Sequence, residues 1–501
     1  MEAAIKSGSN DLKNLLVTYG TLEVPLNAGH DEKSHKSRKR HLELAASSGN
    51  VKLLASIFMI GDSKNFPFSL EDIKVAIKAA IVGGSLDLVG RLLIMYPRVG
   101  SLWVLCEALW QSNNQIIVWI LSWLPSQMLR QSPSIHLSPL WIAIHKRNGD
   151  AIRRLLLAGV DPNLKSRHMC RNEPSDTTEC FQSRRGALEA PIEQAISPRH
   201  GRWEEDTDIV ELLVQYGAQI NFAMDEGSTP LLLSLEKGKY KIAEFLVTQG
   251  ADTEATDAGT SRTPIIFASL AANYSLVNSL IRHGASPKAS SAWGSPIQAL
   301  IYNIPGDTPE AMENLVRTCR LLLNSGADVN GDPTDHCNMT ALQMAIDFGN
   351  QELVEIFLKE GANIHAPAFW RGGRTALQAA ASTGNFKLVK RLVEMGADVN
   401  APPPELGGAT ALHYAAASGH VNTVIFLLEH GASINAPGSS KEGFTALQGA
   451  SEYGRLDMIH LLLENDHDPD TVEKRCRESA DIAKEEGFTQ IVEFLRGYKR
   501  P

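Results

Sequence analysis

The sequence predicts an all-α solenoid of stacked helix-turn-helix units, and two series of residues lead to this fold class. One series is a tetrad of Thr, Ala, Leu and either Gln or His, which begins at Thr340, Thr375, Thr410 and Thr445. The other is a glycine followed by alanine, found at Gly361, Gly396 and Gly431. Neighbouring members of each series are 35 residues apart. Because two independent landmarks keep one period, a single structural unit is repeated along the chain.

The unit 375–398 is predicted to contain two helices. Thr375 is placed to cap the first helix, which Gly384 ends, and its apolar positions recur at helical spacing. The second helix has an apolar stripe of Leu388, Val389, Leu392 and Val393. Gly396 ends this helix, because glycine tolerates the left-handed conformation that often follows a helix. The predicted unit is therefore a helical hairpin.

The segments between the hairpins are predicted to be extended loops, which we call fingers. Residues 401–409, for example, are rich in proline and glycine and have no helical pattern of apolar residues. Both residue types interrupt regular structure, so a third helix is not expected in the unit. If the hairpins stack in register, the fingers project along one edge of the array.

These repeats resemble the ankyrin family. The family signature has Thr-Pro-Leu-His at the first helix, a Gly-His or Gly-Asn turn, and Gly-Ala-Asp-Val-Asn at the entry to the finger. Residues 410–413, 419–420 and 396–400 match it best. Ala replaces Pro in all four tetrads, Gln replaces His in three of them, and the finger 400–410 is longer than usual. This combination resembles the ankyrin arrays of filamentous fungi.

Weaker copies of the unit extend the array in both directions. Upstream of the regular tetrads, units start near Ser138, Pro191, Thr229, Thr263 and Ser295. Four earlier segments keep the paired-helix pattern without the Gly-Ala-Asp motif, at 3–20, 42–61, 75–97 and 103–125. A last hairpin at 479–495 is flanked by charged residues and suits a solubilising cap. The expected array has about 13 repeats plus this C-terminal cap.

Three regions are expected along the chain. Degenerate N-terminal ankyrin-like repeats cover 1–130, ankyrin repeats cover 131–470, and capping helices cover 471–501. Within the second region the turn glycines are more widely spaced at two places, which predicts insertions near 164–190 and 302–313. Insertions in repeat arrays belong on loops.

Composition bears on whether the protein binds nucleic acid, in which compartment it resides and whether it enters a membrane. The formal net charge of −9 disfavours direct binding to nucleic acid. The six cysteines are few, and no apolar leader follows Met1, so we expect a cytoplasmic protein. A basic run at 33–40 is either a solvated loop, which we favour, or a nuclear import signal. The most apolar stretch, 102–124, is interrupted by polar residues 111–115, so no membrane insertion is expected.

The same apolar stretch holds half of the tryptophans of the chain, namely Trp103, Trp110, Trp119 and Trp123. Two interpretations are open, a thick interior, which we favour, and an aromatic docking surface. If the protein were an atypical enzyme, its pocket would lie in this Trp-rich N-terminal half, where the period is weakest.

No catalytic, cofactor or metal site is expected. The common phosphate-binding, nucleophile-elbow and His-Glu-x-x-His motifs do not occur, although catalysis by scattered residues stays open. Zinc-binding residue types occur at His168, Cys170, Cys180 and His200, but their spacing does not match a compact zinc finger. The tripeptide 335–337 resembles part of the palmitoyl transferase tetrad, and we interpret it as an accident within a finger. The ankyrin resemblance implies that His413, at the histidine position of the tetrad, is a structural hydrogen-bonding residue.

The ankyrin resemblance implies a non-catalytic scaffold that binds partner proteins through the concave surface of fingers and first helices. The candidate partner-binding residues are Phe369, Trp370, Arg371, Glu405, Lys441 and Phe444, which lie on three consecutive fingers. Exposed Trp, Phe and Arg are enriched where interfaces concentrate energy, although the rings could instead fold back over their own loops. We expect a monomer with protein partners and no cofactor. The main alternative is the recognition part of a larger fungal signalling or regulatory protein.

Overall fold

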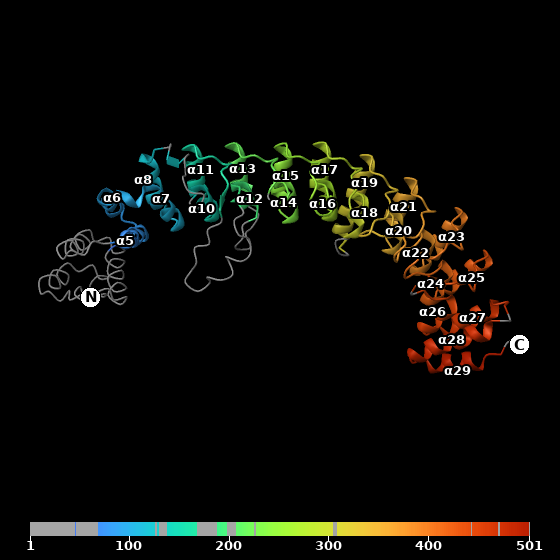
Figure 1. The fold of residues 1–501 in the computed structure, drawn as a ribbon. Coiled ribbons are helices and arrows are strands. Elements are labelled where there is room, and N and C mark those ends of the chain that lie inside the picture. The colour runs from blue at the N-terminus through green and yellow to red at the C-terminus, as the bar shows by residue number, and fades with distance from the viewer. Residues whose placement is uncertain are drawn as a thin grey trace, which may run out of the picture. The chain divides into compact units, whose positions relative to one another are not determined.

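The chain folds as a series of helical hairpins in two layers. The computed structural model describes residues 69–125, 138–167, 188–197, 207–224, 227–303, 308–441, 443–468 and 471–499, together with Ala46 and 128–129. The chain divides into two units, Met1–Asp225 with Lys237–Leu246, and Glu226–Glu236 with Val247–Pro501. Within each unit the first helices of the hairpins form one layer and the second helices form the other (Figure 1). This arrangement confirms the predicted all-α solenoid.

In the described part of the first unit, four hairpins pair α5 with α6, α7 with α8, α10 with α11, and α12 with α13. Their bounds are α5 (Leu70–Val82), α6 (Leu86–Met95), α7 (Ser101–Trp110), α8 (Asn114–Trp123), α10 (Pro139–His145), α11 (Gly149–Leu157), α12 (Pro191–Ile196) and α13 (Thr207–Gln215). A 3-10 helix, η1 (Pro97–Val99), joins the first two hairpins, and most of α15 (Tyr240–Thr248) also belongs to this unit. The hairpins predicted at 75–97 and 103–125 are therefore confirmed. Those predicted at 3–20 and 42–61 lie outside the described residues, apart from Ala46.

The second unit begins with α14 (Pro230–Glu236) and continues through seven hairpins. Their bounds are α16 (Pro264–Leu270) and α17 (Tyr274–Arg282), α18 (Pro296–Tyr302) and α19 (Pro309–Asn324), α20 (Ala341–Asp347) and α21 (Gln351–Lys359), α22 (Ala376–Thr383) and α23 (Phe386–Glu394), α24 (Ala411–Ser418) and α25 (Val421–Glu429), α26 (Ala446–Glu452) and α27 (Leu456–Asn465), and α28 (Val472–Glu485) and α29 (Thr489–Gly497). Each first helix packs against the next first helix, from α14 to α28.

The tetrad has the same local role in each repeat, which is to cap the start of the first helix. The side chain of Thr375 accepts a hydrogen bond from the backbone N–H of Gln378, and the side chain of Gln378 accepts one from the backbone N–H of Thr375. The same reciprocal capping box forms at Thr340, Thr410 and Thr445. Because two otherwise unpaired N–H groups are satisfied at once, each first helix begins at the tetrad.

The turns between paired helices need glycine for two reasons. Gly384 and Gly419 end α22 and α24 in the left-handed conformation, with φ of 71° and 82°. In addition, side chains of the following repeat lie directly against them. A Cβ atom added at Gly384 would overlap the ring of His420, and one added at Gly419 would lie 3.2 Å from Nε of Arg455. The turn glycines therefore serve the contact between repeats as well as the turn itself.

Aliphatic side chains fill the space between the layers. Leu377, Ala380 and Ala381 of α22 are buried, as are Leu388, Val389 and Leu392 of α23. The stripes predicted from the sequence are thus the core, with Val393 at its edge. Among the residues described, no helix is long and apolar enough to cross a membrane.

The two places with wide glycine spacing differ in structure. At the first, β1 (Ser166–Arg167) pairs antiparallel with β2 (Leu188–Glu189), and the residues between these two strands lie outside the described part of the chain. At the second, residues 309–313 are helical, because Thr308 caps α19 and Pro309 follows as its first residue. This helix has 16 residues, whereas α21 has 9. The extra length at 302–313 is therefore only partly a loop. The boundaries expected at 130 and 470 stay predictions.

Candidate protein-binding surface

Three consecutive fingers are joined side by side by backbone hydrogen bonds. Arg371 pairs with Leu406, and Leu406 pairs with Lys441, both as parallel bridges. The N–H of Leu406 donates to the carbonyl of Trp370 at 3.0 Å, and the N–H of Gly372 donates to the carbonyl of Leu406 at 2.9 Å. The N–H of Gly407 donates to the carbonyl of Lys441 at 3.0 Å. We call this arrangement of finger tips the finger ladder.

Serine hydroxyls add further bonds to the finger ladder. The hydroxyl of Ser439 donates to the carbonyl of Pro404 at 2.6 Å, and the hydroxyl of Ser440 donates to the carbonyl of Glu405 at 3.1 Å. On the other side, the side-chain amide of Asn338 donates to the carbonyl of Arg371 at 3.1 Å. Four successive fingers are therefore connected, so their tips form one continuous surface within the second unit.

The bridges of the finger ladder bring three residues into one row. Bridged residues of neighbouring parallel segments lie directly beside each other, so Arg371, Leu406 and Lys441 form this row. Trp370, Glu405 and Ser440 immediately precede them in the chain, in turns or bends. The sequence placed the predicted residues on neighbouring fingers but did not show which of them are bridged. It also overlooked Leu406, because an apolar residue in a loop has no pattern of its own.

The four residues at the ladder differ from the two phenylalanines in exposure. Trp370, Arg371, Glu405 and Lys441 are exposed, and Trp370 keeps 50% of its surface accessible. Phe444 is half-buried, and its ring lies 6.3 Å from the rings of both His413 and Tyr414. Phe369 is also half-buried, with its ring centroid 6.0 Å from that of Trp370. The rings of Phe369 and Phe444 are thus partly covered, whereas Trp370 is exposed, and its role in binding stays a prediction.

The bases of the fingers are held by the tetrad of the preceding hairpin. The side-chain amide of Gln343 donates to the carbonyls of Ala366 and Pro367, and that of Gln378 donates to the carbonyls of Ala401 and Pro402. Each glutamine thus caps its own helix and fixes the following finger. A cleft of about 230 Å³ lies between these two finger bases, lined by residues 364–368, 397–398 and 401–403 together with Thr375 and Leu377.

The position of these glutamines is taken by His413 in the hairpin of α24. Its Nδ1 accepts a hydrogen bond from the backbone N–H of Thr410 at 3.3 Å, and its side chain is fully buried. Burial lowers the pKa of His413 to about 4, while a hydrogen bond with the backbone of Ala436 opposes this shift. The imidazole is therefore neutral near pH 7. The reciprocal capping bonds with Thr410 agree with the expected structural role of His413.

The preceding fingers carry a different set of contacts. The guanidinium of Arg262 pairs with Asp257 at 2.9 Å and lies 4.2 Å from the ring centroid of Phe267. The ring of Trp293 stacks on that of His336 at 5.1 Å. His336 belongs to the tripeptide 335–337, which lies in a finger turn closed by hydrogen bonds between Thr334 and Cys337. This position agrees with the expectation that the tripeptide is an accident of sequence.

A comparison with protein families shows which kind of repeat this chain contains. The family profile described as "Ankyrin repeats (3 copies)" matches residues 201–291, 310–403 and 402–473, together just over half of the chain. The chain belongs to the ankyrin repeat family. Ankyrin repeats are protein-interaction modules in general. The matched segments include all three fingers of the finger ladder.

Two curated proteins with ankyrin-type similarity cover parts of the chain. B-cell lymphoma 3 protein homolog from Mus musculus is 27% identical over 191 residues, which is 38% of this chain and 36% of that protein. Putative ankyrin repeat protein FPV031 from Fowlpox virus (strain NVSL) is 30% identical over 157 residues, 30% of this chain and 43% of that protein. The aligned part of the chain thus spans less than half the length of either relative.

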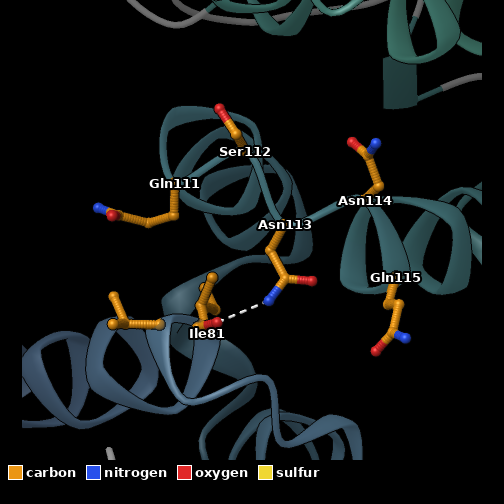
Figure 2. Close-up of a pocket in the computed structure, with 7 residues that line it drawn as sticks. Ile81, Gln111, Ser112, Asn113, Asn114 and Gln115 are labelled. Carbon is orange, nitrogen blue, oxygen red and sulfur yellow. Dashed lines mark hydrogen bonds between the residues drawn. The ribbon is translucent and has the colours of Figure 1, made fainter.

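The Trp-rich hairpins of α5 to α8 contain a hollow, which is the place considered for an enzyme site. It has a volume of about 390 Å³ and is lined by Ile81, Val82 and residues 111–115. Figure 2 shows the amide of Asn113 reaching the carbonyl of Ile81, to which it donates at 2.8 Å, while Gln111 and Asn114 lie apart from it. Among the described residues that line this hollow, none is titratable. It therefore offers no group for acid–base chemistry.

The tryptophans around this hollow are half-buried or exposed, so the favoured interpretation of a thick interior is only partly correct. The ring of Trp110 stacks on His145 at 5.5 Å, and His145 stacks on the buried Trp141 at 5.2 Å. The ammonium groups of Lys146 and Lys74 lie over Trp110 and Trp103, at 4.7 and 5.7 Å from the ring centroids. The alkyl chains and ammonium groups of these two lysines thus cover part of the Trp103 and Trp110 rings.

The other candidate sites receive no support from the described residues. Within that part of the chain, no group of three or more His, Cys, Asp or Glu residues could hold a metal ion. His168, Cys170, Cys180 and His200 lie outside the described residues, as does the basic run at 33–40. Cys106, Cys319, Cys337 and Cys476 are buried.

Proposed function

We propose that this ankyrin repeat protein is a non-catalytic scaffold that binds partner proteins through its fingers and first helices. The observation that supports this function best is the finger ladder, which holds Trp370, Arg371, Glu405 and Lys441 exposed on a backbone fixed by hydrogen bonds. A fixed backbone loses little conformational entropy when a partner binds. Exposed tryptophan and arginine are also the residue types that contribute most to interface energy.

The test uses partners identified by affinity capture and mass spectrometry with the full chain. The affinity of each purified partner is then measured by titration calorimetry for wild type and for Trp370→Ala. We expect the substitution to weaken binding of a true partner by about 2 kcal/mol, with the helical circular dichroism unchanged. Trp123→Ala is the matched control, because Trp123 has 43% of its surface accessible and lies in the other unit. Unchanged affinity of every partner for Trp370→Ala would rule out the finger ladder as the binding surface.

Finer aspects of the function follow from the same proposal. We place the protein in the cytoplasm as a monomer, with entry to the nucleus only if the basic run at 33–40 acts as an import signal. Sedimentation velocity of the full chain tests the monomer, and a fluorescent reporter fused to residues 28–44 tests the signal. The alternative role, as the recognition part of a larger fungal regulatory protein, predicts a transcript that extends upstream of Met1.

A further inference from the structure

Two cations on one face of the finger ladder lack a counter-ion among the described residues. Arg371 and Lys441 are exposed, and neither forms an ion pair with any described side chain. Leu406 lies between them, half-buried, and is bridged to both through the ladder. This face therefore presents a positive, an apolar and a second positive side chain in a row.

Most other arginines of the second unit do have an acidic partner. The pairs are Arg262 with Asp257, Arg320 with Glu352, Arg374 with Asp347, Arg391 with Glu355, Arg475 with Asp466, and Arg496 with Asp481. The chain as a whole carries an excess of acidic residues, with a net charge of −9. Other cations, such as Lys359 and Lys387, also lack an ion pair among the described residues, but Arg371 and Lys441 are held in one row with Leu406 by the bridges of the finger ladder.

The acidic residues beside this row in sequence do not pair with its cations among the described residues. Glu405, which precedes Leu406, forms no ion pair with Arg371 or Lys441, and Glu442 lies outside the described residues. His336 occupies the position 35 residues before Arg371 and is also exposed. The ring of His336 stacks on Trp293, and the bridged row consists of Arg371, Leu406 and Lys441.

We infer that this face binds an acidic segment of a partner protein, with carboxylates on Arg371 and Lys441 and an apolar side chain against Leu406. The inference rests on the proposed scaffold function and adds the chemistry of the partner. Two steps of a ladder separate Arg371 from Lys441, which is about 10 Å. An extended segment covers this distance in about three residues. Two acidic residues at such a spacing can therefore reach both cations at once.

The probe is a fluorescein-labelled peptide of sequence Gly-Glu-Glu-Leu-Glu-Glu-Gly, and the comparison peptide replaces each Glu with Gln. Binding to the full chain is followed by fluorescence anisotropy. The test variant combines Arg371→Glu with Lys441→Glu. The matched control combines Lys359→Glu with Lys387→Glu, two exposed lysines on α21 and α23 that form no ion pair among the described residues. Both double variants change the net charge equally.

We expect the acidic peptide to bind wild type and the control variant alike, and the test variant at least about tenfold more weakly. Raising the salt from about 50 to about 300 mM should weaken this binding, since exposed charges are screened. If the test variant loses helical circular dichroism, Arg371→Gln with Lys441→Gln replaces it and should act in the same direction.

Three results would overturn the inference. They are a failure of the acidic peptide to saturate wild type below about 1 mM, equal binding to both double variants, and equal binding of the glutamine peptide. The proposed scaffold function is judged separately, by captured partners and Trp370→Ala. If captured partners bind Trp370→Ala more weakly but bind the variant Arg371→Glu with Lys441→Glu as tightly as wild type, the binding of an acidic segment is disproved and the scaffold function is not.

Discussion

The hairpin that begins at Ser138 and the one that begins at Thr375 share a fold but are joined to their neighbours by different contacts. In the later hairpin, the side-chain oxygen of Gln378 accepts a hydrogen bond from the backbone N–H of Thr375. Its side-chain amide donates to two carbonyls of the following finger. In the earlier one, Ser138 caps the backbone of Trp141, and the Trp141 ring contacts His145, which stacks on Trp110 of the preceding hairpin. The later hairpin thus uses its tetrad glutamine to contact the following finger, whereas the earlier one contacts its neighbour through stacked rings.

One link is common to both hairpins. Asn163 donates to the carbonyl of Gly217 and accepts from the N–H of Gln219, and Asn400 does the same with Gly431 and Ser433. The hairpin that begins at Ser138 therefore has this asparagine at the entry to its finger, although it lacks the Thr-Ala-Leu tetrad. The comparison indicates that the repeat motif mainly encodes contacts between repeats, and that these contacts can be exchanged one at a time.

The largest expected effect comes from a charge in the core of either hairpin. Leu392 and Leu155 occupy equivalent positions and are both fully buried. Replacing either with Asp should cost more than about 4 kcal/mol locally, because an unpaired carboxylate would be buried. In Leu392→Asp, hydrogen-exchange mass spectrometry should show loss of protection in both neighbouring hairpins, and thermal unfolding should occur in two steps. Leu155→Asp should affect a shorter segment.

Lys387→Asp provides the control for this experiment, because Lys387 is exposed on the same helix as Leu392. It should leave the exchange pattern unchanged. If Leu392→Asp kept a single unaltered thermal transition, the hydrogen-bonded repeats would not behave as a linked array.

The second prediction removes the hydrogen bonds that distinguish the regular hairpin. Gln378→Leu keeps a side chain of similar size but leaves the N–H of Thr375 and the carbonyls of Ala401 and Pro402 without their partner. The free energy of unfolding should fall by about 2 to 4 kcal/mol, measured by urea denaturation. Gln378→His should cost less than about 1 kcal/mol, because histidine fills the same role at position 413. Equal losses for both variants would show that side-chain volume, not hydrogen bonding, matters here.

The third prediction concerns pH and again compares two tetrads. The pKa of His413 is lowered to about 4 in the folded protein from 6.5, so protonation favours the unfolded state. Its contribution is fully present above pH 6.5 and is lost as the pH falls toward 4. Between pH 7 and pH 5, wild type should lose about 2 kcal/mol through this residue. His413→Gln, which copies the tetrad of Thr375, should lose correspondingly less over the same range in urea titrations. An identical pH dependence of the two proteins would contradict the burial of a neutral imidazole.

The smallest effect is expected at the turn between paired helices. Ser112 of the first unit has φ of 55°, at a turn position where regular hairpins have glycine. Ser112→Gly should stabilise the protein by up to about 1 kcal/mol, because a left-handed conformation is unfavourable for serine. Gly384→Ala should instead cost about 1 to 2 kcal/mol, since φ is 71° and the added methyl group meets His420. If the two substitutions changed the midpoint temperature of thermal unfolding in the same direction, the two turn positions would not be equivalent.

The sequence by itself determined the repeat unit, its capping residues and the hairpins of the described chain. These features depend on local spacing, since Thr375 caps a helix and Gly384 ends it whatever the rest of the chain does. It also located three of the fingers that carry the candidate surface. It could not show that Arg371, Leu406 and Lys441 form one bridged row, because the parallel bridges join residues 35 positions apart. Nor could it show that Phe444 folds back against His413 and Tyr414. Which side chains of a loop remain exposed is decided by packing between repeats, and only the tertiary structure provides those neighbours.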